Sequence, residues 1–260
     1  MRRFIGDLKR YYRYIFYSAK SILKQEVADS FLNWIWLILN PIMFMLVYAF
    51  VQIAIFGNET KYLASFLFIG LTCWNFFNPC ITGSIRMIKR YQGIISKVYV
   101  PKYVFLLSNM LVNGFKTLIS FGLVIISLIA YRIPFSPRMF WCIPYLLVLF
   151  LVTFGLSCIL LHAGVFLDDL ANIVPIAMRM LFFLSGIFYN LEGKLKGGLG
   201  YVMEQLNPVA HIILQMRRTM IYDKPASVHW LLFWFAAGLV LSVIGIALIY
   251  KYERRYVKSI

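Results

Sequence analysis

The sequence predicts an all-α integral membrane protein with six transmembrane helices, an N-terminal amphipathic interface helix and short re-entrant helices between the fifth and sixth spans. Two observations predict this class. Hydrophobic residues make up 62% of the 260 positions and charged residues only 14%, whereas a soluble domain carries roughly 25% charged residues. Apolar runs also recur at the length of about 20 residues that crosses a hydrocarbon core.

Residues 1–29 are predicted to form a cytoplasmic helix that lies in the membrane interface. Basic residues fall mostly on other faces of this helix than its apolar residues, which is typical of an interfacial helix. The apolar residues recur at spacings of three and four, at Phe4, Leu8, Tyr11, Ile15, Ala19 and Ile22.

The six spans are predicted within residues 30–250, and their approximate ranges are 31–56, 62–85, 103–130, 140–166, 173–189 and 228–250. The region 190–227 is mixed in character. Apolar residues at helical spacing run from Leu199 to Leu206, Asn207-Pro208 breaks the pattern, and the apolar stretch 209–216 is too short to span. Two short helices that dip into the outer leaflet fit this pattern. Irregular backbone at that depth is tolerated only beside protein or a water-filled cavity.

The distribution of Lys and Arg predicts the orientation. Residues 1–29 carry seven of these cations, the loop 86–102 five, and the tail 251–260 four. With six spans these regions share one side, so both termini are expected in the cytoplasm of a bacterium, with the chain in its inner membrane. The net charge of +16 is then explained by anionic lipid rather than by nucleic acid. The four cysteines lie inside apolar runs without a CxxC pair and are expected to be buried hydrophobic residues.

Five stretches in order along the chain resemble one known family, the ABC-2 type permeases that export polysaccharide, O-antigen, capsule or teichoic acid. The stretches are Trp34-Ile-Trp36 through Asn40-Pro41 to Leu46-Val-Tyr48, then Gly70-Leu71 with Trp74-Asn75-Phe76-Phe77, then Gly93-Ile-Ile-Ser-Lys97-Val-Tyr-Val-Pro101-Lys102, then Ser185-Gly186-Ile187-Phe188-Tyr189, and finally Asn207-Pro208. Two positions depart from the family pattern: Gly186 replaces a usual Pro, and Asp168-Asp169 stands where Arg-Asp is common.

The sequence contains no P-loop motif GxxxxGK[ST], so the chain is not expected to hydrolyse ATP by that route. The resemblance implies a homodimer of this chain with two copies of a separate ABC-type ATPase. We therefore expect no cofactor in this chain, with ATP and Mg²⁺ held by the partner ATPase. The resemblance also implies export of a polyprenyl-linked polysaccharide or a polymer of the teichoic-acid type.

The loop 86–102 is the candidate docking site for the ATPase. Its apolar residues at helical spacing, with basic residues between them, predict a short amphipathic helix that inserts into a partner groove. A plain basic loop against anionic lipid is the alternative. The docking residues predicted are Arg86, Lys89, Arg90, Tyr91, Ile94, Ile95 and Lys97.

Two clusters of aromatic residues are candidates for a substrate path, because sugar rings stack on aromatic faces. They are Trp74, Phe76 and Phe77, and Phe182, Phe183, Phe188 and Tyr189. An interfacial aromatic belt with ordinary packing is the alternative. Arg179, a charge inside an apolar segment, is the candidate to bind a pyrophosphate or to gate its access, unless it only reaches the headgroups. Lys116 is expected to reach headgroups or to pair within the dimer.

Three other function classes stay open on the sequence. One is a related exporter of a small hydrophobic drug or lipid. The others are a membrane-embedded transferase, which wants clustered His, Asp or Glu, and an ion-coupled transporter, which wants mid-span carboxylates and inverted halves. Neither pattern is visible, and the three histidines, at 162, 211 and 229, are isolated. No metal site and no catalytic residue are predicted.

Overall fold

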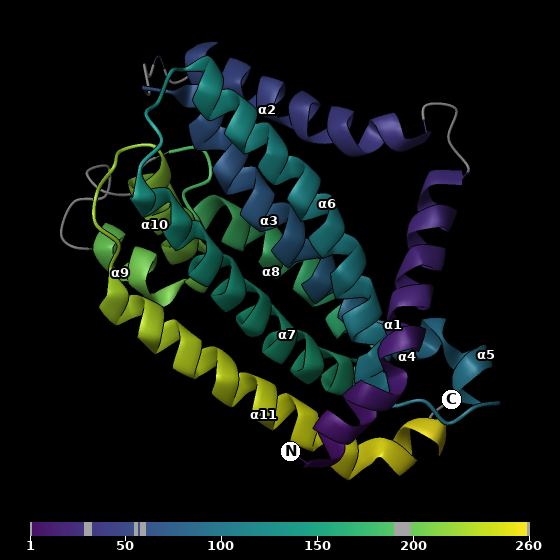
Figure 1. The fold of residues 1–260 in the computed structure, drawn as a ribbon. Coiled ribbons are helices and arrows are strands. Elements are labelled where there is room, and N and C mark those ends of the chain that lie inside the picture. Colours follow the sequence, from purple (N-terminus) through teal and green to yellow (C-terminus); the bar gives the residue numbers. More distant parts are fainter. Residues whose placement is uncertain (1, 29–32, 55–56, 58–60, 190–198, 259–260) are drawn as a thin grey trace.

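The computed structural model describes residues 2–28, 33–54, 57, 61–189 and 199–258. All the regular elements in these ranges are helical (Figure 1). The elements are α1 (Arg2–Ala28), η1 (Asn33–Ile35), α2 (Trp36–Ala54), α3 (Leu63–Ile85), α4 (Met87–Arg90), α5 (Gln92–Ile95), α6 (Lys102–Ala130), η2 (Pro137–Trp141), α7 (Cys142–Phe166), α8 (Leu170–Leu184), α9 (Leu199–Leu206), α10 (Pro208–Met220) and α11 (Val228–Lys258).

Five stretches of the described chain are long and apolar enough to cross a membrane: α2, α3, α6, η2 with α7, and α11 up to Glu253. The predicted fifth span forms α8, which begins three residues earlier than expected and has only 15 residues. A helix of that length extends about 22 Å, which is short of a hydrocarbon core of roughly 30 Å. The all-helical membrane class is therefore confirmed with five candidate spans, and the crossing by α8 stays a prediction.

Other predicted elements form helices with shifted boundaries. The amphipathic segment 1–29 is α1, and the mixed region 190–227 contains α9 and α10, separated at Asn207 as the sequence predicted. The Asn207 side chain accepts hydrogen bonds from the backbone N–H groups of Val209 and Ala210, so it caps α10. The helix α11 continues beyond the predicted sixth span through residues 251–258 of the predicted tail.

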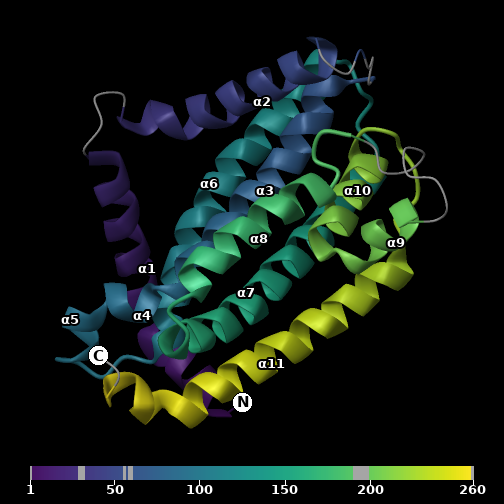
Figure 2. The same cartoon turned by 180° about the vertical axis from the view of Figure 1, so that it is seen from behind.

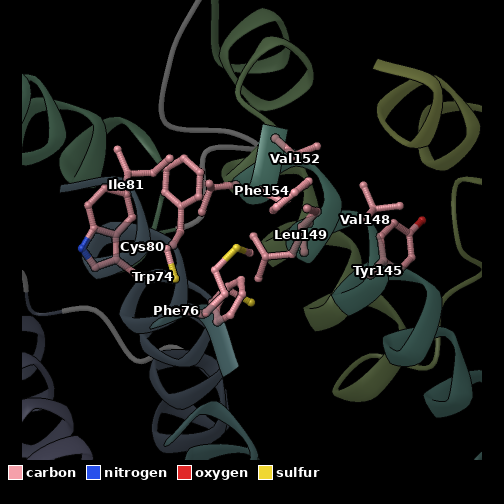
Figure 3. Packing of buried hydrophobic residues seen from close by; sticks show 14 of the residues in the cluster. Trp74, Phe76, Cys80, Ile81, Tyr145, Val148, Leu149, Val152 and Phe154 are labelled. Atoms are coloured by element: carbon pink, nitrogen blue, oxygen red, sulfur yellow. The ribbon is translucent and has the colours of Figure 1, made fainter. Parts of the chain in front are cut away.

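The helix α3 lies at the centre of the bundle and packs against α6, α7, α2, α10 and α8. Figure 3 shows its side chains meeting those of α7, with Phe76 directed toward Leu149. Phe76 also stacks near Phe150 of α7, with ring centroids 6.2 Å apart. Residues Leu67, Ile69 and Cys73 are fully buried in this core.

Small residues let α7 and α11 approach closely. A Cβ atom on Gly155 of α7 would lie 2.7 Å from the backbone nitrogen of Ser242 in α11, and one on Gly245 of α11 would press on Cys158 of α7. Small residues at a helix contact permit such close approach in membranes. The helices α3, α7 and α11 thus form a tightly packed body.

Both ends of the chain lie at the end of the bundle that carries α4 and α5 (Figures 1 and 2). We call this end the basic end, defined by the start of α1, the loop 86–102 and the end of α11. The helices α9 and α10 lie at the opposite end. A shared side for both termini and the loop agrees with the distribution of Lys and Arg in the sequence.

Candidate functional site

A cavity of about 700 Å³ opens between α2, α3 and α8. We call it the aromatic cavity. Its wall combines aromatic rings with amides and one guanidinium, and it is formed by Phe44, Tyr48, Leu71, Trp74, Asn75, Asn78, Thr82, Pro175, Met178, Arg179, Phe182 and Phe183. Trp74 of α3 and Phe182 of α8 face each other across helices, with ring centroids 5.2 Å apart. The cavity therefore offers flat apolar faces beside hydrogen-bonding groups.

A second cavity, of about 590 Å³, lies between α2, α3, α6 and the end of α1. We call it the amide cavity. It shares Phe44, Asn75 and Asn78 with the aromatic cavity, so the two are neighbours along one wall of α3. Its wall is formed by Glu26, Trp36, Leu37, Asn40, Pro41, Phe44, Asn75, Asn78, Pro79, Asn113, Lys116, Thr117 and Ser120.

Lys116 forms an ion pair with Glu26 of α1 in the amide cavity, with 2.5 Å between Nζ and the carboxylate. Pairing within the chain explains how a cation is tolerated inside an apolar helix, since unpaired charges are costly there. The sequence predicted that Lys116 reaches the headgroups or pairs within the dimer. The structure gives it a carboxylate of its own chain instead.

Asn75 is the only exposed residue of α3, a helix of which 78% of the most apolar window is buried. A lipid-facing position would favour an apolar side chain, whereas Asn75 borders both cavities. Intramembrane polar groups face a bundle interior or a water-filled space. Asn75 therefore marks the side of α3 that faces such a space.

The sequence also contains a spacing pattern that predicts the α3 wall of the aromatic cavity, in addition to its aromatic residues. Leu71, Asn75, Asn78 and Thr82 recur at spacings of four and three, which places them on one face of α3. All four line the aromatic cavity. The polar residues Asn75, Asn78 and Thr82 on one face of an otherwise apolar span are therefore the feature that predicts the cavity side.

The predicted aromatic residues do not all line the same space. Trp74, Phe182 and Phe183 line the aromatic cavity. Phe77 is buried, with its ring centroid 6.1 Å from that of Trp74. Phe76 instead borders an apolar groove of about 580 Å³ between α1, α6 and α7, on the side of α3 away from Trp74 (Figure 3).

The two aromatic residues beyond α8 close the gap between α8 and α2. The Phe188 ring lies 4.4 Å from the Tyr48 ring of α2 and 4.9 Å from the Phe182 ring, measured between centroids. The Tyr189 hydroxyl donates a hydrogen bond to the Phe183 carbonyl oxygen. Both residues thus support the wall that Phe182 and Phe183 form.

Arg179 is exposed on α8 and lines the aromatic cavity. Of the ion pairs among the described residues, none includes Arg179. Its guanidinium therefore lies on the cavity wall without a carboxylate partner among the described residues, and its role toward a pyrophosphate stays a prediction.

A buried arginine that the sequence analysis missed fixes the turn after α8. Arg217 of α10 donates hydrogen bonds to the carbonyl oxygens of Gly186 and Ile187, each at 2.7 Å, and of Phe66 in α3, at 3.1 Å. Its guanidinium carbon also lies 3.4 Å from the centroid of the Phe66 ring. One side chain thereby joins α10, α3 and the turn that holds the end of α8 in place.

Gly186 occupies the left-handed region in this turn, with φ of 63°. Proline, which is usual at this position in the family that the sequence resembles, has φ fixed near −65° and could not adopt this conformation. The left-handed turn at this position is therefore one that glycine permits and proline does not, and the hydrogen bond from Arg217 to the Gly186 carbonyl stabilises it.

The loop 86–102 forms two short helices, α4 and α5, rather than one. Most of the apolar side chains predicted to dock the ATPase pack against other residues of this chain instead. Ile88 and Ile95 are buried, and the Tyr91 ring stacks on Phe105 of α6 with centroids 4.6 Å apart. Of the predicted docking set, the exposed residues are Arg86, Lys89, Arg90, Ile94 and Lys97. Val98 and Tyr99 are also exposed, and the spacing pattern did not point to them.

Lys89 of α4 forms an ion pair with Asp168, in the turn between α7 and α8. A hydrogen bond from Lys89 and its positive charge hold the pKa of Asp168 below its usual range. The sequence left the role of the Asp168-Asp169 turn open. The pair connects the loop 86–102 to the start of α8, the helix that carries Arg179 and Phe182.

A polar network joins α1 and α11 to the start of α6 at the basic end. The Tyr250 hydroxyl donates to the Asp7 carboxylate at 2.8 Å, and the Tyr103 hydroxyl lies within hydrogen-bonding distance of both. Beside it, Arg3 contacts both Tyr99 and Glu253. The loop 86–102 is thereby held between the first and last helices of the chain.

Comparison with known proteins decides the family. Residues 14–221 match the model of the family described as ABC-2 type transporter. The chain belongs to the ABC-2 type transporter family. The resemblance seen in the sequence is confirmed, and the two cavities and the loop 86–102 are features of an ABC-2 membrane subunit.

The ABC-2 chain is also similar to named relatives along most of its length. Two proteins of Klebsiella pneumoniae, each named O-antigen export system permease protein RfbA, are 25% identical over 235 residues, which cover 90% of this chain and 90% of each relative. A protein of the same name from Myxococcus xanthus is 25% identical over 217 residues, or 82% of both chains.

Proposed function

We propose that this chain is the permease subunit of an ABC exporter that moves a lipid-linked polysaccharide across the bacterial inner membrane. A separate ABC-type ATPase, in two copies, would drive a homodimer of this chain. The observation that carries the proposal is the aromatic cavity, in which Trp74, Phe182 and Phe183 lie beside amides in an ABC-2 family member. Flat rings next to hydrogen-bonding groups suit a chain of sugars.

The proposed orientation places the basic end in the cytoplasm, because Lys and Arg gather there. In this arrangement α1 lies in the inner interface, α8 crosses as a short sixth span, and α9 and α10 dip into the outer leaflet. The Arg179 guanidinium would bind the diphosphate that links the polymer to its polyprenyl carrier, since arginine binds phosphate oxygens with two parallel hydrogen bonds.

The ATPase would dock on the exposed part of the loop 86–102. The Lys89–Asp168 ion pair supports a route from this loop to α8. A displacement of α4 would shift the start of α8, and with it Arg179 and Phe182 on the cavity wall. The network of Asp7, Tyr103 and Tyr250 would carry the same displacement to α1 and α11.

Depletion of this chain in its host tests the proposed function. We expect lipid-linked polymer to accumulate in the cytoplasmic leaflet and to disappear from the cell surface. Complementation with Phe182→Ala and Phe183→Ala, both on the wall of the aromatic cavity, should restore the protein level but reduce export severalfold. Phe50→Ala, exposed on α2 outside both cavities, serves as the matched control. Normal surface polymer after depletion would refute the proposal.

Docking is tested by reversing the exposed charges of the loop. We expect the Arg86→Glu, Arg90→Glu double variant to lose co-purification of the ATPase, with Lys89 kept so that its pair with Asp168 stays intact. The Lys61→Glu, Lys224→Glu double variant, at two exposed positions outside the loop, is the control of equal charge change. ATPase binding that is unchanged in the Arg86→Glu, Arg90→Glu variant would place the docking surface elsewhere.

A further inference from the structure

The two cavities contain few charges for their size. Among the residues that line them, Arg179 and Lys116 are cations and Glu26 is a carboxylate. Because Glu26 pairs with Lys116 at 2.5 Å, one positive charge is left, that of Arg179. The walls thus offer a single site for an anion.

Asparagines provide most of the remaining polarity. Asn40 of α2 and Asn75 of α3 are exposed, and Asn78 of α3 is half-buried. Among the described residues none of the three side chains has a hydrogen-bond partner. Each amide has two N–H donors and an acceptor oxygen. The three side chains can therefore donate hydrogen bonds to hydroxyl groups and accept hydrogen bonds from them.

Prolines add backbone acceptors on the same sides of the helices. Pro41 in α2 and Pro79 in α3 both line the amide cavity. A proline inside a helix lacks the N–H that would bond the carbonyl four residues earlier. The carbonyl groups of Leu37 and Asn75 are the ones that lose this donor, and both residues line the amide cavity.

We propose that Asn40, Asn75 and Asn78 are the specificity-determining residues of the path and select a polymer of neutral, hydroxyl-rich sugars over one with a phosphate in each repeat. The inference rests on the proposed function and narrows its substrate class. A neutral glycan satisfies the amides through its hydroxyl groups. A polyanion would bring several charges into a space between apolar helices that offers one free cation to pair with them, and unpaired charge within a membrane is unfavourable.

A labelling experiment on the purified full-length chain in lipid nanodiscs tests this selection. The reporter is Phe44→Cys, because Phe44 is exposed and lines both cavities. The four native cysteines are buried, so their background reaction with a water-soluble maleimide is small. The probes are the neutral oligosaccharide maltoheptaose and an oligomer of glycerol phosphate with a similar length.

We expect maltoheptaose to slow the labelling of the reporter at concentrations where the glycerol phosphate oligomer does not. In the reporter background, Asn75→Leu with Asn78→Leu should weaken this protection about ten-fold, because two hydrogen bonds are lost. Asn75→Ser, which replaces the amide by a hydroxyl group that can still donate and accept a hydrogen bond, should retain more protection than Asn75→Leu. Phe50→Cys, exposed on α2 outside both cavities, should be protected by neither probe.

Three results would overturn the inference. They are equal or better protection by the glycerol phosphate oligomer, no protection by either probe, and undiminished protection in the Asn75→Leu, Asn78→Leu variant. The labelling does not depend on export, so a failure here is distinct from normal surface polymer after depletion, which would refute the proposed function itself.

Discussion

The helices α2 and α3 are both apolar, yet they are used in opposite ways. In the most apolar window of α3, 78% of residues are buried, and in that of α2 only 11%. The helix α3 presents one exposed side chain, Asn75, whereas α2 presents large apolar side chains along most of its length. Hydropathy therefore identifies a span but does not say whether protein or lipid will cover it.

The difference in burial between α2 and α3 indicates that the two walls of the cavities are held in place to different degrees. The wall on α3 is fixed, because α3 is held by α7 on one side and by Arg217 on another. The wall on α2 makes fewer contacts with the rest of the chain. We expect substitutions in the fixed body to reduce stability, and substitutions on the α2 side to leave stability nearly unchanged.

The largest effect is expected from Arg217→Met. The change removes three hydrogen bonds and leaves the carbonyl oxygens of Gly186 and Ile187 buried without a hydrogen-bond partner among the described residues, at a cost of about 3–5 kcal/mol. Thermal unfolding in detergent should show a fall in Tm of about 10 °C. Arg138→Met, which breaks the exposed pair with Asp223, is the control and should shift Tm by about 1–3 °C at most.

A smaller loss is expected from Gly155→Val. The new side chain would meet the backbone of α11 near Ser242, and overpacking of this kind costs about 1–3 kcal/mol. The fraction of monodisperse protein after heating measures the loss. Gly114→Val on α6, where an added Cβ meets nothing within 4 Å, should behave like the wild type. Equal behaviour of the two variants would mean that α7 and α11 are not tightly packed.

The sequence predicted the positions of the helices far better than it predicted which of their side chains are buried and what these contact. Periodicity and length located α1, α3, α6, α9 and α10, since these depend on local apolar spacing. The burial of Ile88 and Ile95 could not be predicted, because the same ridge could pack on the chain itself or on a partner. Arg217 was missed for a related reason: its three acceptors are backbone carbonyls on distant segments, and these leave no mark in the sequence.

A change that affects function more than stability is expected from Asp168→Asn. The pair with Lys89 lies at the surface, so Tm should hardly change. Export should fall severalfold while the ATPase still co-purifies, because the link from α4 to α8 is lost. The charge-swapped Lys89→Asp, Asp168→Lys variant should recover export, and a swap without recovery would exclude this route.

The pH dependence of that link follows from the lowered pKa of Asp168. A carboxyl group whose pKa is depressed in the folded state contributes stability above its unfolded pKa of about 4 and loses it as the pH falls through the folded pKa. Between pH 6 and pH 8 this pair should therefore contribute nothing to the pH dependence of ATP-driven export in proteoliposomes. An Asp168-dependent change in that range would contradict the assignment.

The smallest effect is expected from Phe50→Ala on α2. The ring is 69% exposed, so its removal should change the free energy of unfolding by about 0.5 kcal/mol or less. Leu67→Ala on α3, a fully buried position, should cost about 2–5 kcal/mol. Urea unfolding of both variants in mixed micelles compares them directly, and similar losses would remove the distinction between the two helices.

The most direct test of the central claim is the reactivity of a cysteine at position 75. In the structure, α3 turns Asn75 toward the two cavities, which we expect to be filled with water, whereas exposed apolar side chains of the spans such as Leu118 are expected to face lipid. With a charged, membrane-impermeant thiol reagent, Asn75→Cys should react many times faster than Leu118→Cys, which is 68% exposed on α6 beside the apolar groove. Equally slow reaction of the two cysteines would contradict the claim.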